Sequence, residues 1–188
     1  IPEENQKNFS EKIIYLPNSY MVNDSNKKIF DKIIKREEFD LPKEGFVFCC
    51  FNKNYKITPS IFDIWMKLLK KVDKSVLWLS EENIITIENL KLEASKRGVD
   101  ANRIIFSKRV STLALHFARH KLADLFIDTF PFTAHSTCTD ALWSGLPVLT
   151  MMGQSFASRV SGSLLNAIDL DELIANSEKE YEDIAIKL

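Results

Sequence analysis

Glycine is scarce in this 188-residue chain, and the five glycines form none of the common phosphate-binding loops. The first expected strand is followed by Asn52 to Lys56 (NKNYK) and not by a G-x-G-x-x-G turn that could hold a dinucleotide pyrophosphate. The patterns G-x-x-x-x-G-K-[ST] and G-x-S-x-G are absent too. These absences disfavour a nicotinamide-dependent dehydrogenase, a P-loop nucleotide hydrolase and an α/β-hydrolase.

An excess of one charge is also lacking. The 25 Lys and Arg residues nearly balance the 26 Asp and Glu residues, for a net charge of −1. Electrostatics therefore gives no reason to expect nucleic acid or an anionic membrane surface as a partner. The chain has no apolar run of about eighteen residues that could span a membrane, and its first ten residues do not resemble a signal peptide. We expect neither a nucleic-acid nor a membrane partner.

Cysteine is rare, and its spacing matches no common disulfide or metal-binding pattern. Cys49, Cys50 and Cys138 are odd in number and contain no C-x-x-C pattern, which argues against a disulfide framework and against a structural zinc site. A reducing compartment is the simplest interpretation, and we expect the cytoplasm. The chain does not begin with Met, so we also expect it to be a fragment of a longer protein.

What the chain does contain is an alternation of short apolar runs with segments of helical period. Strands are expected at 46–51, 75–79, 103–106, 125–128 and 147–150. Helices are expected at 59–72, 87–97, 111–121, 137–144, 158–168 and from about 171 to the end. This alternation predicts an α/β fold with a Rossmann-like, doubly wound parallel sheet over residues 46–188. Residues 1–45 do not fit the pattern and are expected to form a connector or the remnant of a preceding lobe.

A short polar turn between two apolar runs is the strongest candidate for a binding site. It carries His135, Ser136, Thr137 and Asp140, and it should lie at the carboxyl end of a parallel strand and open a helix. Ligands of open α/β sheets bind there, because the amides at a helix start are free to bind anions. A purely structural interpretation also exists: Ser136 or Thr137 caps the helix and Asp140 stabilises its first turn.

Six ordered motifs resemble one known family. They match the carboxyl-terminal half of the catalytic region of the O-linked N-acetylglucosamine transferase family, including its SPINDLY-like bacterial members. The motifs are FCCFNKNYKITPSIFDIW, SVLWL, NRIIFS, H-x-x-R-x-x-LADLFIDTFP, AHSTCTDALWSGLPVLT and EYEDIAIKL. The resemblance runs from about Phe9 to Leu188. It implies an inverting GT-B glycosyltransferase, of which this chain is the donor-binding lobe, truncated at its carboxyl end.

The resemblance also assigns a diphosphate-binding group. The family lysine that contacts the donor diphosphate falls on Lys56, where a cation would stabilise the charge of the leaving group. The family H-[ST]-T turn falls on His135, Ser136 and Thr137, whose amides and hydroxyls would face the diphosphate without a metal ion. Without these motifs, Lys56 would be interpreted as a solvated loop lysine.

The nucleoside would be held by a second group. His116 and Arg119 match the family positions that bind the uracil base, and they are three residues apart on one helix face. Asp140 matches the family acid that hydrogen-bonds the ribose. The implied partners are a nucleotide sugar, a protein acceptor with Ser or Thr, and the amino-terminal catalytic lobe, which would supply the general base. We therefore expect this chain to bind donor without turning it over, and to need no cofactor.

Several functional alternatives stay open. The implied donor is UDP-N-acetylglucosamine, but Lys53 and Leu113 differ from the animal enzymes, which carry glutamine and a ribose-contacting lysine there. GDP-fucose or UDP-glucose are alternative donors on the same scaffold. A degenerate, non-catalytic interaction module is the remaining alternative, and it would bind no nucleotide.

Overall fold

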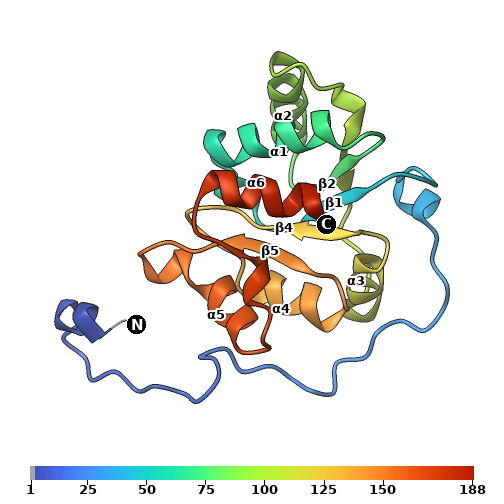
Figure 1. Cartoon of the computed structure of the whole chain (residues 1–188). Helices are drawn as coiled ribbons and strands as arrows, with labels where there is room; N and C mark the ends of the chain where they lie inside the picture. Colours follow the sequence, from blue (N-terminus) through green and yellow to red (C-terminus); the bar gives the residue numbers. More distant parts are fainter. Residues whose placement is uncertain (1–2) are drawn as a thin grey trace.

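A six-stranded, all-parallel sheet forms the centre of the molecule (Figure 1). The computed structural model describes residues 3–188, so Ile1 and Pro2 of the expected connector lie outside the described part. The strands lie in the order β3-β2-β1-β4-β5-β6. Their bounds are β1 Val47–Cys50, β2 Val76–Ser80, β3 Ile104–Ser107, β4 Leu125–Ile127, β5 Val148–Met151 and β6 Ile174–Ala175. The order reverses between β1 and β4, where open α/β sheets bind their ligands.

Helices cover both faces of the sheet (Figure 1). In that view α1, α2 and α6 lie on one face, and α3, α4 and α5 lie on the other. Their bounds are α1 Pro59–Lys71, α2 Ile84–Lys96, α3 Leu113–His120, α4 Ser136–Trp143, α5 Val160–Asn166 and α6 Glu178–Lys187. The expected α/β, Rossmann-like fold with a doubly wound parallel sheet is thereby confirmed.

Local sequence signals explain where several helices begin. The side chains of Thr58, Asn83, Thr112 and Ser177 each accept a hydrogen bond from the backbone N–H three residues later. Each of them therefore satisfies one of the amides that a helix start leaves without a partner.

The carboxyl end differs from the expected single helix from residue 171. A short 3-10 turn at Asp171–Leu173 leads into β6, and α6 begins only at Glu178. Strand β6 has two residues and pairs with β5 through Thr150 and Met151. So short a strand shows no detectable period in the sequence. It forms because the backbone of β5 offers hydrogen-bonding groups on the side away from β4.

The core lies between the sheet and its helices. Trp65, Trp78 and Tyr181 are among its largest fully buried side chains. Packing was the expected role of all three tryptophans, but the structure corrects this for Trp143, which is 39% exposed and donates its Nε1–H to the Lys27 carbonyl at 3.3 Å. None of the helices in residues 3–188 is long and apolar enough to cross a membrane.

An extended segment precedes the sheet and passes α5, α4 and α3 before it reaches β1 (Figure 1). Regular structure in it is limited to 3-10 turns at Glu3–Asn8 and Arg36–Phe39. Arg36 fixes its end, because its guanidinium donates to the Leu122 carbonyl at 3.0 Å and the Gly45 carbonyl at 2.8 Å. The same guanidinium pairs with the Asp124 carboxylate at 2.9 Å. The division into a connector and a lobe at residue 45 stays a prediction.

Two glycines with positive φ provide a matched test of this architecture. Gly45 has φ 102° and Gly145 has φ 83°. A Cβ on Gly45 would lie 2.2 Å from the Lys74 carbonyl oxygen, whereas a Cβ on Gly145 would meet no described atom within 4 Å. We expect Gly145→Ala to lower the free energy of unfolding by about 1 kcal/mol, the cost of the left-handed backbone. Gly45→Ala should lower it clearly more. Urea unfolding followed by circular dichroism would show this, and equal losses would contradict it.

Candidate functional site

The candidate site is built on a buried carboxylate at the carboxyl edge of the sheet. Asp128 follows β4 and is 1% exposed. Its Oδ1 accepts hydrogen bonds from Asn52 Nδ2 at 2.9 Å and from the backbone N–H groups of Thr129 and Ala134, both at 2.8 Å. Its Oδ2 accepts from Thr150 Oγ1 at 2.8 Å. Burial raises the pKa of Asp128, and the hydrogen bonds partly counteract that rise.

Asn52 connects Asp128 to the polar turn through hydrogen bonds. Its amide N–H groups donate to Asp128 and to Thr129 Oγ1, so its carbonyl oxygen Oδ1 is left to accept the hydrogen bond from Thr137 Oγ1. The hydroxyl proton of Thr137 therefore points to Asn52. Thr137 can then donate to an anion only through its backbone N–H. Sequence reasoning missed Asn52, although it lies only two residues after the end of β1.

The turn opens α4 with no side-chain cap. His135 occupies the N-cap position and makes no capping hydrogen bond, and neither Ser136 nor Thr137 is the cap. The capping alternative is therefore wrong for these two hydroxyls. Burial and then the charge of Lys56 lower the pKa of His135, which favours its neutral form. Its Nδ1 lies 3.3 Å from the Tyr20 hydroxyl.

Lys56 reaches the same turn from the segment that follows β1. It lies in a 3-10 turn, Asn54–Lys56, between β1 and α1. Its ammonium donates to the Thr133 carbonyl at 3.0 Å and lies 3.7 Å from the centre of the Phe132 ring. Burial lowers the pKa of Lys56, and the charge of Asp128 partly offsets this. The structure thus brings Lys56 next to the residues that lead into His135.

A second group of side chains lies between α3 and α4. The buried guanidinium of Arg119 donates to Ser107 Oγ at 2.9 Å and to the Lys108 carbonyl at 3.1 Å, and it lies over the Phe51 ring at 4.1 Å. Burial lowers its pKa to about 10. Its Nη2 lies 2.8 Å from Nδ1 of His116.

This contact fixes the tautomer of His116. A guanidinium can only donate, so Nδ1 of His116 accepts and its proton is on Nε2. That Nε2 lies 3.5 Å from Asp140 Oδ2. The structure therefore joins Arg119, His116 and Asp140 in one directed chain. Ser136 and Asp140 are four residues apart on α4 and so share a helix face, which connects this group with the polar turn.

Two residues of the extended segment complete the surroundings. Lys27 Nζ lies 3.3 Å from Asp140 Oδ1, and the Tyr20 hydroxyl faces His135. Sequence reasoning missed both, because the segment has no regular pattern from which its path over the site could be predicted. Phe132 was missed as well, although its place between β4 and the turn was a usable signal.

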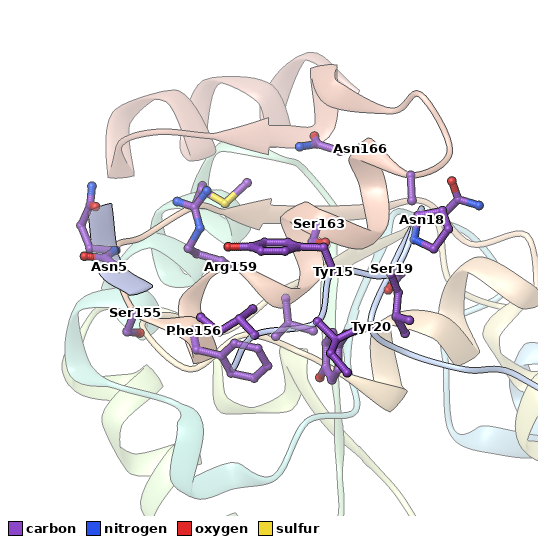
Figure 2. Close-up of a pocket in the computed structure, with 18 of the residues that line it drawn as sticks. Asn5, Tyr15, Asn18, Ser19, Tyr20, Ser155, Phe156, Arg159, Ser163 and Asn166 are labelled. Carbon is purple, nitrogen blue, oxygen red and sulfur yellow. The ribbon is translucent and has the colours of Figure 1, made fainter. Parts of the chain in front are cut away.

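A cavity of about 920 Å³ adjoins the turn, between the extended segment and α5 (Figure 2). Tyr15 and Arg159 lie across its centre in that view. Tyr20 and Phe156 line the cavity and also lie close to His135, with ring centres 6.5 and 6.3 Å from the imidazole. The cavity therefore lies beside His135, although none of the residues from His135 to Asp140 lines it. Residues 3–188 contain no cluster of three His, Cys, Asp or Glu side chains that could hold a metal ion.

Comparison with known proteins places the chain in a family of glycosyltransferases. The sequence profile of glycosyl transferase family 41 matches residues 28–188. The chain belongs to this family, as the motifs predicted.

Two relatives illustrate the extent of the similarity. The chain is 38% identical over 186 residues to a probable UDP-N-acetylglucosamine–peptide N-acetylglucosaminyltransferase, SEC, of Arabidopsis thaliana, covering 96% of this chain and 19% of the relative. It is 41% identical over 156 residues to the UDP-N-acetylglucosamine–peptide N-acetylglucosaminyltransferase of Caenorhabditis elegans, covering 83% of this chain and 14% of the relative. The chain thus spans less than a fifth of the length of these relatives.

A solved structure agrees with the fold. A K341M mutant of the O-GlcNAc transferase of Thermobaculum terrenum superimposes with a TM-score of 0.73 at 32% identity. The match covers 76% of this chain and 28% of that protein.

His120 allows a test of how the group of side chains around His116 is supported. It is fully buried, and its Nδ1 donates to the His116 carbonyl at 2.8 Å. Burial is the main cause that lowers its pKa to about 3. The unfolded chain binds a proton near pH 6.5 and the native chain does not, so this group makes the protein less stable as pH falls from about 6.5 toward 3.

Between pH 7 and pH 5 we expect this effect to cost about 2 kcal/mol of unfolding free energy. His120→Gln removes the titration. Urea unfolding at the two pH values should therefore show a smaller loss for the variant than for the original chain. Equal losses would show that His120 titrates normally in the folded protein.

Proposed function

We propose that this chain is the donor-binding half of an inverting GT-B enzyme that transfers N-acetylglucosamine from UDP-N-acetylglucosamine to Ser or Thr hydroxyls of proteins. Membership of family 41 and the names of the relatives support the reaction class and the donor. The observation that carries the proposal is the convergence of the Lys56 ammonium with the uncapped start of α4 at the carboxyl edge of the sheet.

This convergence suits a diphosphate leaving group. The first amides of a helix and a neighbouring ammonium both attract negative charge. As the bond between sugar and diphosphate breaks, charge grows on the departing oxygen, and donors that are already in place stabilise it. Because Asp128 and Asn52 hold the turn in position, little rearrangement is needed when that charge develops. Lys56 is thus the proposed catalytic cation.

The group beside α3 suits a nucleoside. Asp140 offers carboxylate oxygens to ribose hydroxyls, and His116 offers an aromatic face with a fixed tautomer next to Arg119. A nucleotide sugar carries its diphosphate at one end of the ribose and its base at the other. The proposal places the diphosphate at Lys56 and the nucleoside at Asp140. The general base and the acceptor-binding groups are assigned to the amino-terminal lobe, so the partners are that lobe, a protein acceptor and the nucleotide sugar. No metal and no cofactor take part in the proposal.

Calorimetric titration of the chain with UDP and with GDP tests the proposal. We expect UDP to bind more tightly than GDP and Lys56→Ala to weaken UDP binding by about 10- to 100-fold, the cost of losing a charged hydrogen bond to a phosphate. Lys96→Ala is the control, because it removes the same charge from an exposed side chain that pairs with Glu93, far from the turn in the sequence. Its affinity should change less than twofold.

The outcomes separate the alternatives. Preference for GDP would replace the donor by GDP-fucose. The absence of binding by either nucleotide would favour a non-catalytic module and overturn the proposal.

A further inference from the structure

The extended segment crosses the nucleoside end of the candidate site. The backbone N–H of Phe30 donates to the Ala114 carbonyl in α3 at 3.1 Å, and the Lys27 carbonyl accepts from Trp143 Nε1 in α4 at 3.3 Å. These two hydrogen bonds hold the segment against both helices that frame Asp140. Lys27 is therefore held in place by its backbone and not only by its charge.

The ammonium of Lys27 is directed inward. Its side chain is 16% exposed, its Nζ lies 3.3 Å from Asp140 Oδ1 and it lies 5.4 Å from the centre of the Phe117 ring. Neighbouring Lys28 is exposed by comparison. A pair so little exposed is weakly screened by salt, in contrast to surface ion pairs.

Lys27 and His116 hold the two oxygens of one carboxylate. Lys27 binds Oδ1, and Nε2 of His116, oriented by Arg119, faces Oδ2 at 3.5 Å. Burial alone would raise the pKa of Asp140, but the hydrogen bond from His116 and the charge of Lys27 bring it below its ordinary value. The carboxylate is thus kept ionised and fixed in orientation.

We propose that Lys27 is a positioning residue of the nucleotide site, which holds the Asp140 carboxylate in the orientation that accepts the hydroxyls of the nucleotide ribose. The inference rests on the proposed function, since it takes the ligand to be a nucleoside diphosphate. An ionised carboxylate has about four acceptor positions. One donor on each oxygen leaves room for two hydroxyl donors, the number that a ribose presents at its 2′ and 3′ positions.

The rival interpretation predicts the opposite change in nucleotide affinity. If the segment covered the place of the ribose, Lys27 would compete with the nucleotide, and removing its charge would tighten binding. If Lys27 positions Asp140, removing it weakens binding, and only in the presence of the Asp140 carboxylate. A double-mutant cycle separates these interpretations.

The experiment measures UDP affinity by calorimetry for the unmodified chain and for Lys27→Met, Asp140→Asn and the double variant. We expect Lys27→Met to weaken UDP binding by about 5- to 30-fold, and Lys27→Arg to retain most of the affinity because it keeps the charge. Lys28→Met, the matched control, should change it less than twofold. In the Asp140→Asn background, Lys27→Met should have less than a twofold effect.

A second probe keeps the test independent of the Asp140 variant. With 2′,3′-dideoxy-UDP as ligand, the penalty of Lys27→Met should disappear, which a general loss of folding would not produce. Tighter UDP binding by Lys27→Met would overturn the inference, and so would a penalty that persists with the dideoxy nucleotide or with Asp140→Asn. If the chain binds UDP and responds to Lys56→Ala but not to Lys27→Met, only this inference fails. If the unmodified chain binds no nucleotide, the proposed function fails and this inference with it.

Discussion

The buried carboxylate of Asp128 is the constraint on which the site depends. It lies where β4 ends, between the ends of β1 and β5, and it accepts hydrogen bonds from Asn52 and Thr150, which follow or belong to those two strands. Its own backbone carbonyl accepts from the Tyr181 hydroxyl of α6 at 2.9 Å. A buried carboxylate is tolerated only when hydrogen-bond donors surround it, because desolvation penalises its charge. The need to satisfy Asp128 therefore fixes how the ends of three strands and one helix meet.

The geometry of the polar turn follows from that requirement. Since the Asn52 amide group must donate to Asp128, its oxygen must accept from Thr137, and the first turn of α4 is tied to β1. The N–H of Ala134 is used by the same carboxylate, which sets the path of the chain into His135. The start of α4 is therefore preorganised by these hydrogen bonds, while the N-cap residue His135 makes no side-chain capping bond to its first amides. Electrostatic stabilisation of a developing charge requires this kind of fixed donor arrangement.

The sequence predicted five of the six strands and proposed residues that the structure brings together at one edge of the sheet. It predicted neither the contacts between those residues nor the neighbouring Asn52, Lys27 and Tyr20. Five strands of buried apolar residues were predicted because each is long enough to show its pattern, whereas the two-residue β6 was not. Lys56 and the turn at His135 were proposed as site residues from motifs of fixed spacing. The hydrogen bonds that join Asp128, Asn52 and Thr137 connect three segments that meet only after folding. No periodic pattern in the sequence predicts them. The path of Lys27 over Asp140 is hidden for the same reason.

The two ends of the site are consequently supported in different ways. The end at Lys56 and α4 is held by groups of the sheet itself, through hydrogen bonds that originate at the fully buried Asp128. The end at Asp140 depends in addition on the extended segment, which is attached by few hydrogen bonds and is more exposed than the sheet. Because a segment with few buried contacts opens more easily than a core strand, the end at Asp140 is the part of the site whose order can change. A ligand that spanned both ends would therefore meet one rigid end and would add hydrogen bonds to the less rigid one.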